Sequence, residues 1–503
     1  IHAATGELVA FIDDDAYPDV HWLRYLAYSY LTTDHGGIGG PNVLPANDGP
    51  IATCVANAPG GPVHVLTTDE IAEHIPGCNM SFRRNVLLEI GGLDPIYRSA
   101  GDDVDLCWRV QLTGRTIGFH PSAMVWHHRR NSIKAYWKQQ KGYGRAEALL
   151  EQKWPERYNR LGHLSWTGQI YGNGVTQPLE PRKGKIFHGI WGTAPFQSIY
   201  QPAPTLIAFL PLMPEWYLLI GFLAFLSVLG LVWSPLLLAI PVAVAALLVL
   251  LVQAGVSAAK ARFPVQSTTQ RFKYWALTTF LHFIQPLARL YGRFAYGLTP
   301  WRWRGPHPYT FSALFCHTRV LTKWSETWRS TEEWLTDMEK TLMESSVRVQ
   351  PGGTFDKWDL QINDGFCSLV RGVLVIEEHG AGKQLLRFKC WTRYSRISSA
   401  LLAVLAGLAL LAVVNSQYFV SLVLGLLVGV IAISYFTGTA RAMATLTNAF
   451  EQPVKADDTT EVSVTESSEP AKEEKLDTVY YSSETTRVRP LALSDGRLLS
   501  RRI

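Results

Sequence analysis

The chain has 503 residues, of which 47% are hydrophobic and 18% are charged, and it carries a formal net charge of +5 with a pI near 8.7. This length is more than one hydrophobic core requires, so we expect several domains. The positive charge is too mild for a dedicated nucleic-acid-binding protein, and its position beside apolar blocks favours a membrane surface as the partner. Six cysteines are scattered without a Cys-x-x-Cys pair, which favours buried reduced thiols over a zinc site or disulfides.

The first 200 residues read as a soluble α/β domain. The opening, from Ile1 to the apolar run 7–12, is typical of a helix end that leads into a buried parallel strand, so we expect the chain to start inside this domain. Residues 101–114 predict a helix with acidic residues in its first turn. Residues 21–31 predict an earlier helix with four side chains on its buried face: Trp22, Leu23, Leu26 and Tyr30.

Three consecutive carboxylates, Asp13, Asp14 and Asp15, follow the first predicted strand. In an open α/β sheet, ligands bind where the carboxyl ends of the strands emerge. Asp13 and Asp15 lie two residues apart on extended chain and can point the same way, so they could share a hard divalent ion that bridges a diphosphate. The alternative is a solvated turn before the helix.

A second acidic cluster begins the helix predicted over 101–114. Asp102 and Asp103 stand among apolar neighbours, a half-buried setting that suits a general base beside a hydroxyl group. The alternative is that these acids only stabilise the helix through their interaction with the positive end of its dipole. Farther on, His127 and His128 follow a strand-like run, where one of them could bind a metal or a phosphate, or both could be structural or exposed.

Two pairs of long apolar stretches follow the α/β domain. Each stretch is near the ~20 residues that cross a bilayer as a helix, so we expect transmembrane hairpins over 205–256 and 397–437. Lys and Arg flank both hairpins but are missing from their short turns. This asymmetry predicts that all soluble segments face the cytoplasm.

Three further segments are predicted around the hairpins. Residues 257–304 mix charges with apolar residues, which fits an amphipathic helix in the membrane interface better than a span. Residues 305–396 predict a small α+β cytosolic domain, with strands and a helix opened by a capping box at Ser330 and Glu333. Residues 438–503 predict a cytosolic tail that is largely disordered, because its later part is charged, rich in Ser and Thr, and has little to bury.

Three stretches of the first 150 residues together carry a family resemblance: GELVAFIDDDAYPDVHWL, PGCNMSFRRNVLLEIGGLDP and GDDVDLCWRVQLTGRTIGFHPSAMVWHH. In this order the chain resembles the membrane-bound branch of the inverting, family-2 glycosyltransferases. The resemblance implies an α/β, GT-A-like (Rossmann-like) catalytic domain over 1–200 that is truncated at its N-terminus. The first strand and helix of such a domain, which bind the nucleotide base, would precede Ile1.

The resemblance also implies roles for individual side chains. Asp13 and Asp15 match the family's DxD pair, which holds Mg²⁺ or Mn²⁺, with Asp15 as the more direct ligand and Asp13 nearer the ribose. His127 matches a histidine that in some relatives helps hold the metal and the diphosphate. Asp103 matches the base that deprotonates the acceptor, and Asp102 stands beside it where Glu is commoner.

Five further side chains are expected to line the donor and acceptor pocket: Asn79, Arg83, Asp105, Arg109 and Gln140. One feature departs from the family pattern. Processive members carry Gln-x-x-Arg-Trp near the first membrane helices, whereas here Gln139 or Gln140 persists and the Arg-Trp pair does not. The departure predicts transfer of single sugars rather than polymerisation.

These expectations combine into one predicted activity. The enzyme would move a sugar from a nucleotide-sugar donor to a hydroxyl on a lipid-linked or glycan acceptor, with inversion, during synthesis of the cell envelope or of an extracellular glycan. It would reside in a bacterial inner or plasma membrane, in contact with membrane lipid. Two alternatives stay open at this point: a metal-dependent nucleotidyltransferase or hydrolase, and a non-enzymatic membrane scaffold.

Overall fold

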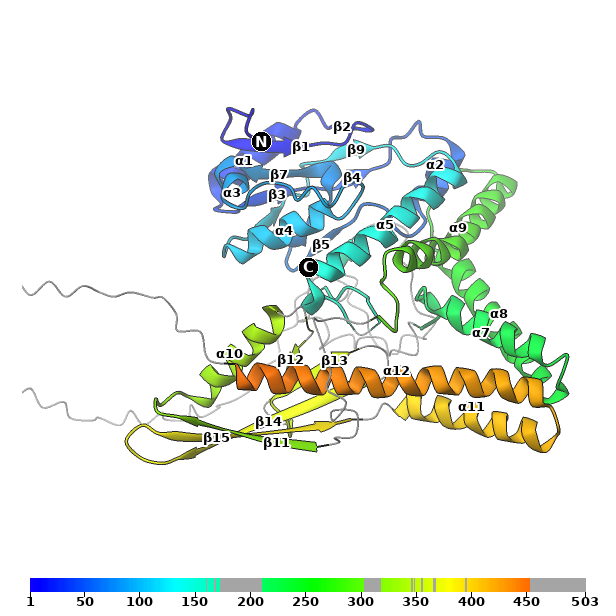
Figure 1. Ribbon diagram of the computed structural model, residues 1–503. Helices are drawn as coiled ribbons and strands as arrows, with labels where there is room; N and C mark the ends of the chain where they lie inside the picture. The colour runs from blue at the N-terminus through cyan, green and yellow to red at the C-terminus, as the bar shows by residue number, and fades with distance from the viewer. Residues whose placement is uncertain are drawn as a thin grey trace, which may run out of the picture. The chain divides into compact units, whose positions relative to one another are not determined.

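The computed structural model describes the chain in ten segments: residues 1–159, 161–166, 169–171, 210–302, 318–344, 347, 349–353, 356–364, 368–393 and 396–452. Figure 1 shows the elements that these segments form. The last part of the predicted catalytic domain, 172–200, and the predicted tail from residue 453 lie outside the described residues.

The helices of the first 171 residues are α1 (Trp22–Thr32), α2 (Pro50–Ala56), α3 (Arg84–Glu89), α4 (Asp102–Leu112) and α5 (Ile133–Lys153), with short 3-10 turns η1 (Gly77–Asn79) and η2 (Pro155–Arg157). The first turn of α4 holds the predicted acidic residues, so this helix is confirmed. A small three-stranded sheet joins β2 (Ala16–Pro18), β9 (Val125–His127) and β4 (Asn42–Val43).

A mixed sheet of seven strands lies at the centre of the same part (Figure 1). In spatial order the strands are β1 (Leu8–Phe11), β7 (Met80–Arg83), β3 (Gly37–Gly39), β8 (Ile117–Phe119), β6 (Ile71–His74), β5 (His64–Leu66) and β10 (Gln169–Tyr171). β3 and β8 run parallel, and the other neighbours run antiparallel. Apolar side chains of the sheet pack against α3 and α4 in one core. This mixed α/β sheet is consistent with a GT-A region.

Two predictions for this part need correction. The strand predicted over 7–12 exists as β1, but among the described strands it pairs only with β7, antiparallel and at the sheet edge, so it is half exposed. In α1, Trp22, Leu26 and Tyr30 are buried as predicted. Leu23 is 69% exposed instead, because successive residues of a helix point about 100° apart.

Within the described residues, two helical stretches are long and apolar enough to cross a membrane. They are Ser234–Ala259, which joins the 3-10 turn η5 (Ser234–Leu238) to α8 (Ala239–Ala259), and α12 (Tyr418–Glu451). α7 (Trp216–Leu229), preceded by η4 (Leu210–Leu212), packs on α8, and α11 (Arg396–Val414) packs on α12. The 14 residues of α7 extend about 21 Å. That is less than the ~30 Å hydrocarbon core of a bilayer.

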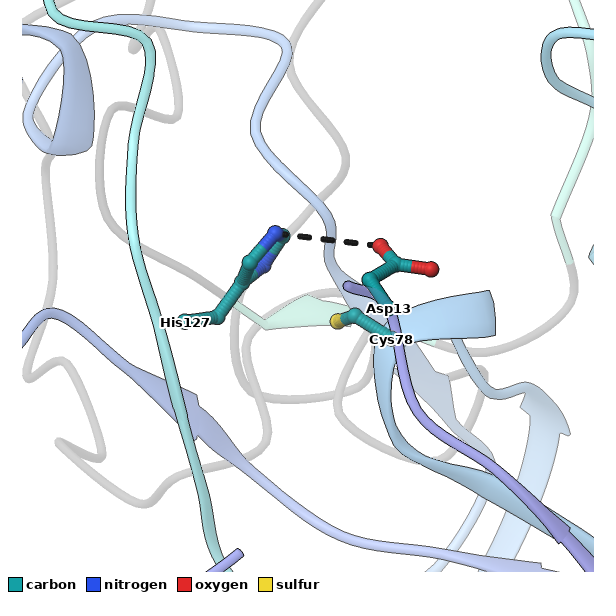
Figure 2. A group of neighbouring side chains, drawn as sticks. All are labelled: Asp13, Cys78 and His127. Carbon is teal, nitrogen blue, oxygen red and sulfur yellow. Dashed lines mark ion pairs between the residues drawn. The ribbon is translucent and has the colours of Figure 1, made fainter. Parts of the chain in front are cut away.

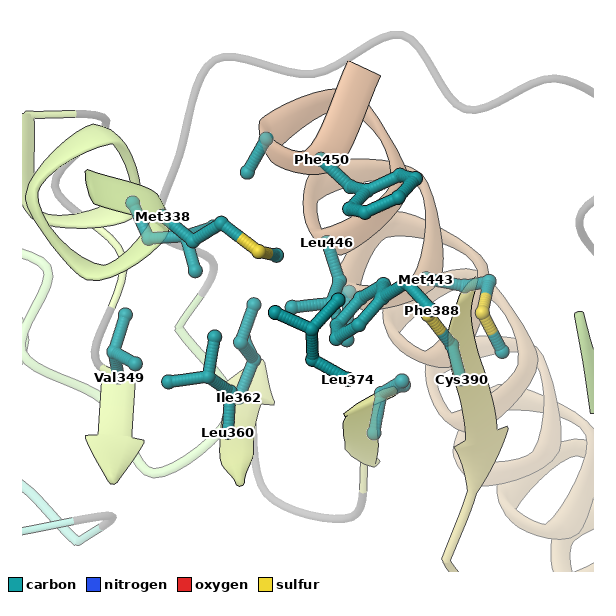
Figure 3. Packing of buried hydrophobic residues seen from close by; sticks show 14 of the residues in the cluster. Met338, Val349, Leu360, Ile362, Leu374, Phe388, Cys390, Met443, Leu446 and Phe450 are labelled. Carbon is teal, nitrogen blue, oxygen red and sulfur yellow. The ribbon is translucent and has the colours of Figure 1, made fainter. Parts of the chain in front are cut away.

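A second folded unit is a five-stranded antiparallel sheet, in the order β11 (Thr318–Ser325), β15 (Gln384–Thr392), β14 (Ser368–Glu378), β13 (Leu360–Asp364) and β12 (Val349–Pro351). One face packs against α10 (Thr331–Glu344) and the last turns of α12, as Figure 3 shows. The capping box is confirmed, because the Glu333 N–H donates to Ser330 Oγ at 3.2 Å and the Ser330 N–H donates to the Glu333 carboxylate at 3.3 Å.

The C-terminal boundary of this unit differs from the prediction. The sequence predicts a tail from residue 438, but α12 continues to Glu451. Met443, Leu446 and Phe450 fill the core over the sheet, and the Phe450 ring stacks on Phe388 with 5.2 Å between centroids (Figure 3). Residues 438–451 are therefore part of a folded domain.

α5 crosses α9 (Thr268–Ala295) with the two backbones in contact. A Cβ atom on Gly144 would overlap the carbonyl oxygen of Arg289, and one on Gly292 would overlap the carbonyl oxygen of Lys141. Only glycine permits an approach this close. The crossing therefore depends on one glycine in each helix.

Buried charges surround the crossing. The carboxylate of Glu147 accepts hydrogen bonds from Arg289 at 2.7 Å and from Arg293 at 2.6 Å. Arg293, which is buried, also donates to Glu215 at 2.9 Å, and His163 contacts the same carboxylate at 2.7 Å. Burial opposes ionisation of Glu147, but the two arginines lower its pKa to about 2.

Gly144→Ala is expected to destabilise the protein, because the new methyl group must push α5 away from α9. Overpacking of this kind costs about 1–3 kcal/mol. Thermal unfolding of the full chain in detergent measures the effect. Gly142→Ala is the matched control, since its Cβ would lie 4.0 Å from the nearest side-chain atom, Ser99 Oγ. Equal thermal-unfolding midpoints for both variants would contradict the proposed dependence of stability on the close crossing of α5 and α9.

Candidate functional site

The three carboxylates of residues 13–15 form a turn between β1 and β2 (the acidic turn). β2 pairs with β9 in a register that sets Ala16 opposite His127. The next residue, His128, donates its backbone N–H to the carbonyl oxygen of Asp15 at 3.0 Å. The small second sheet therefore carries His127 to the acidic turn.

His127 is buried and contacts two carboxylates of the acidic turn. Its Nε2 lies 3.0 Å from Asp15 Oδ1 and 3.7 Å from Asp13 Oδ2. On the other side of the ring, Arg129 donates to Nδ1 at 2.6 Å. Because a guanidinium only donates, Nδ1 accepts, and Nε2 carries the ring proton toward Asp15. Burial and the Arg129 charge lower the pKa of His127 to about 4, so the ring is neutral.

Both carboxylate oxygens of Asp15 have charged or polar partners, whereas the carboxylate of Asp13 is largely unpaired. The second oxygen of Asp15 pairs with Arg130 at 3.0 Å. Within the described residues the Asp13 carboxylate makes no ion pair beyond that with His127 and no hydrogen bond, and its side chain is 50% exposed. Burial and the charges of Asp15 and Asp103 raise the pKa of Asp13. Carboxylate oxygens are the donors that hard divalent cations prefer, so the acidic turn fits Mg²⁺ or Mn²⁺.

Asp103 lies at the start of α4, held by two backbone N–H donors and by an ion-pair contact with His74. Its Oδ2 accepts the Gly77 N–H at 3.1 Å and lies 3.3 Å from His74 Nε2. Its Oδ1 accepts the Val104 N–H at 2.9 Å. Burial would raise the pKa of Asp103, but His74 and the hydrogen bonds lower it, so the carboxylate is ionised. The side chain keeps 21% exposure and can be reached from solvent.

Asp102 behaves differently from its neighbour. Burial and the charge of Asp103 raise the pKa of Asp102 to about 6. The helix that carries both begins after Gly101, whose φ of +91° is a conformation that side chains rarely adopt. The two adjacent carboxyl groups therefore differ in their affinity for a proton.

The turn η1 lies between the acidic turn and Asp103. Gly77 holds Asp103, and the next residue, Cys78, offers its Sγ within 4.8 Å of ligand atoms of Asp13 and His127 (Figure 2). Burial and the Asp13 charge raise the pKa of the Cys78 thiol well above its usual range. The charge of Asp103 also raises the pKa of Asp13. The two carboxylates are therefore close enough to influence each other electrostatically.

Asn79 is fully buried and uses its side chain to join loops. Its Oδ1 accepts from Trp22 Nε1 at 2.9 Å, and its Nδ2 donates to the carbonyl oxygens of Pro41 at 2.9 Å and Ala123 at 2.8 Å. The amide has no spare group for a ligand. These contacts give Asn79 a structural role, and its predicted contact with substrate stays a prediction.

Arg83 caps the end of α1 instead of facing the pocket. Its guanidinium donates to the carbonyl oxygens of His35 at 2.9 Å, Tyr30 at 3.0 Å and Thr33 at 2.8 Å. These carbonyls lie at or beyond the last turn of a helix, where they lack partners along the helix. These contacts give Arg83 a structural role, and its predicted contact with substrate stays a prediction.

Asp105 and Arg109 form a buried ion pair one turn apart on α4. Arg109 Nε lies 2.7 Å from Asp105 Oδ2. The other oxygen of Asp105 contacts Lys153 Nζ at 2.7 Å and Trp154 Nε1 at 2.9 Å. These contacts fasten α4 to the end of α5, and the predicted substrate contacts of both residues stay predictions.

Gln140 is fully buried between α5, α9 and a loop. Its Nε2 donates to the carbonyl oxygen of Gly60 at 3.0 Å, and its Oε1 accepts from Gln285 at 3.2 Å. The side chain therefore bridges protein segments, and its predicted place in the substrate pocket stays a prediction.

Three residues beside the predicted acids were not found from the sequence: His74 on β6, Cys78 in η1 and Tyr143 on α5. Burial and the charge of Asp103 raise the pKa of Tyr143 to about 12, and the guanidinium of Arg289 lies over its ring at 5.6 Å. No local pattern marks His74 or Tyr143, because only the fold brings them to Asp103. Cys78 stands inside the stretch 76–95 of the family resemblance, which is the signal that could have found it.

The family described as glycosyl transferase family group 2 matches residues 8–322. The chain is similar to a pre-mycofactocin glycosyltransferase of Mycobacterium tuberculosis, with 27% identity over 187 residues, 34% of this chain and 39% of the relative. It is also similar to a glucosyl-dolichyl phosphate glucuronosyltransferase of Haloferax volcanii, with 30% identity over 138 residues, 24% of this chain and 43% of the relative. The matched part spans about two-fifths of each relative's length.

Asp102→Asn is expected to stabilise the fold above about pH 6. Folding raises the pKa of Asp102 from 3.8 to about 6, so the wild-type chain loses stability as the pH rises through this window and the variant does not. The unfolding midpoints of both proteins, measured across this range, should diverge with rising pH and then keep a constant gap. Asp69→Asn, at an exposed position, is the control, and the difference between its midpoint and that of the wild type should stay the same across this range. A gap that opens only toward acid pH would contradict the assignment.

Proposed function

The chain belongs to glycosyl transferase family group 2 and is therefore a glycosyltransferase, and we propose that it moves a sugar from a nucleotide-diphosphate donor to an acceptor hydroxyl with inversion. The observation that carries this proposal is the position of the turn η1 between the two acidic groups. Its Gly77 donates to Asp103, and the Sγ of the next residue, Cys78, lies within 4.8 Å of an Asp13 carboxylate oxygen. Asp13 can thus help to bind the nucleotide-sugar donor, and Asp103 can act on the acceptor hydroxyl. Membership of an enzyme family sets the scaffold alternative aside, and no contact of the site favours a nucleotidyltransferase or hydrolase.

Enzymes of this family typically depend on a divalent metal ion. We assign Mg²⁺ or Mn²⁺ to Asp13, Asp15 and His127. When bound, the cation supplies neutralisation of the charge that develops on the leaving nucleoside diphosphate. For His127 to bind through Nε2, the ring proton must move to Nδ1, so Arg129 would have to leave the position in which it donates to that atom.

Asp103 is the proposed base for the acceptor. Its lowered pKa keeps it ionised at neutral pH, ready to accept a proton from a hydroxyl group that becomes acidic during the transfer. Gly77 and His74 fix the direction in which its free lone pairs point. A single in-line attack by the activated hydroxyl then inverts the anomeric centre.

Arg129 and Arg130 are the proposed contacts of the diphosphate. Both stand beside the acidic turn, and a guanidinium recognises phosphate oxygens with two parallel hydrogen bonds. Arg130 is 45% exposed and pairs with Asp15, so it can turn toward a ligand without leaving a buried charge behind. We retain single-sugar transfer, because Tyr143 and Gly144 follow Gln140 where processive members carry Arg-Trp.

A membrane location fits the apolar helices and the unusual faces of α9. The side of α9 that packs on the protein carries polar groups, among them His282, Gln285 and Arg293. Its exposed side carries large apolar groups: Phe272, Phe280, Leu287 and Tyr291. Water would disfavour that exposed face, so we propose that α9 lies in the lipid interface of a bacterial inner or plasma membrane, with the catalytic domain in the cytoplasm.

A lipid-linked acceptor follows from that location. The similar enzyme of Haloferax volcanii is named for a glucosyl-dolichyl phosphate. A site held close to the bilayer by α9 would meet an acceptor whose lipid stays in the membrane and whose sugar reaches the cytoplasm. A glycan acceptor is the second possibility, and the nature of the product distinguishes them.

Asp103→Asn is expected to reduce glycosyl transfer by about 10²–10⁴-fold while donor binding persists, because only the proton acceptor is lost. Transfer is measured in membranes of cells that express the full chain, with radiolabelled nucleotide sugars and with Mg²⁺ or Mn²⁺. Chelator should abolish transfer in the wild type. Asp34→Asn is the matched control and should keep full activity. Unchanged turnover in Asp103→Asn would reject the assigned base.

Leu287→Cys, labelled with a fluorescent probe, is expected to be quenched by brominated lipids when the full chain is reconstituted in vesicles. The side chain is 38% exposed on the apolar side of α9, so a probe there would enter the interface. Leu31→Cys on α1, where the native side chain is 87% exposed, is the control and should stay unquenched. Equal quenching at both positions, or none at 287, would contradict the interfacial placement.

A further inference from the structure

The proposed reaction gives no task to Cys78, a side chain of the site that can bind metal ions. It is 2% exposed, lies in η1 between the two acidic groups, and sits within 4.8 Å of ligand atoms of Asp13 and His127 (Figure 2). The three groups come from separate parts of the chain: the acidic turn, η1 and β9. A sulfur, a nitrogen and a carboxylate oxygen thus converge on one point.

This donor set differs from that of a magnesium site. Mg²⁺ takes oxygen ligands and does not favour thiolate, whereas Zn²⁺, Co²⁺ and similar cations bind sulfur and imidazole strongly. Three protein donors of these types are what catalytic zinc sites provide. Replacement of Cys78 by an apolar residue would leave only the oxygens and one nitrogen.

We propose that the site has a second mode of metal binding, in which a thiophilic divalent cation of the zinc type is held by Cys78, His127 and Asp13. The inference rests on the proposed function, because it takes Asp13 and His127 from the site of the hard cation. On binding, the Cys78 thiol loses its proton to solvent and its sulfur forms the bond to the metal. The thiophilic cation therefore competes with Mg²⁺ or Mn²⁺ for the same two residues.

The geometry requires two adjustments. The ring proton of His127 must move from Nε2 to Nδ1, so Arg129 must leave its present position, as it must for the hard cation. The donor atoms must also approach one another. Zinc bonds of about 2.0–2.3 Å place the donor atoms of a tetrahedral site roughly 3.3–3.8 Å apart. The three atoms lie within 4.8 Å of one another, so they must close by about 1 Å. Asp13 is half exposed and lacks a hydrogen bond to other described residues, so its side chain is free to make this movement.

The proposal is tested by spectroscopy of the full chain in detergent, without donor or acceptor. After chelation, Co²⁺ is titrated in, and wild type should show the near-ultraviolet charge-transfer band of a cobalt–thiolate bond, which Zn²⁺ then abolishes. Cys78→Ser and Cys78→Ala should lose the band and bind Co²⁺ at least ~100-fold more weakly, since loss of outer-shell partners alone costs 10–100-fold. Cys54→Ser, at another buried cysteine, is the matched control and should keep the band.

Mn²⁺ binding, followed by electron paramagnetic resonance in the same samples, separates a ligand from a structural residue. It should be nearly unchanged in Cys78→Ser, because the hard cation uses only the oxygens and the imidazole. Absence of the band in wild type, its persistence in both Cys78 variants, or an equal loss of Mn²⁺ and Co²⁺ in both would overturn the proposal. None of these results depends on turnover, so inactivity in the transfer assay would count against the proposed function alone.

Discussion

The contact between α5 and α9 is the constraint on which both the candidate site and the apolar helices depend. The backbones touch at Gly144 and Gly292, and the buried guanidinium of Arg293 is neutralised beside them by Glu147 and Glu215. Burial of such a charge is tolerated only when its partners are present, because the loss of one leaves an uncompensated ion. The residue next to the crossing on α5, Tyr143, is near enough to Asp103 for that charge to raise its pKa, so the crossing lies beside the candidate site.

Elements that are stabilised by near neighbours could be predicted from the sequence. The capping box of Ser330 and Glu333 satisfies donors within one turn, and it appears as expected. The acidic first turn of α4 and the carboxylates that follow β1 are likewise local features. The family resemblance then supplied the pairing of Asp13 with Asp103 in one site, which no local pattern could have given.

Polar side chains that join distant segments could not be predicted in this way. Asn79, Arg83 and Gln140 have the chemistry of ligand-binding residues, but loop carbonyls and other side chains consume their hydrogen-bonding groups. Buried polar groups must find partners, and a sequence does not say whether the partner is a substrate or the protein itself. The edge position of β1 and the length of α12 depend in the same way on contacts far along the chain.

α12 joins two environments in a single uninterrupted helix. Its first half packs with α11 and α7 among apolar side chains, and its last turns complete the core of the antiparallel sheet. A helix of 34 residues is about 51 Å long and behaves as a stiff rod. The small domain is therefore mounted on the rod rather than tethered by a linker, and any change in the tilt of the rod would swing the whole sheet with it.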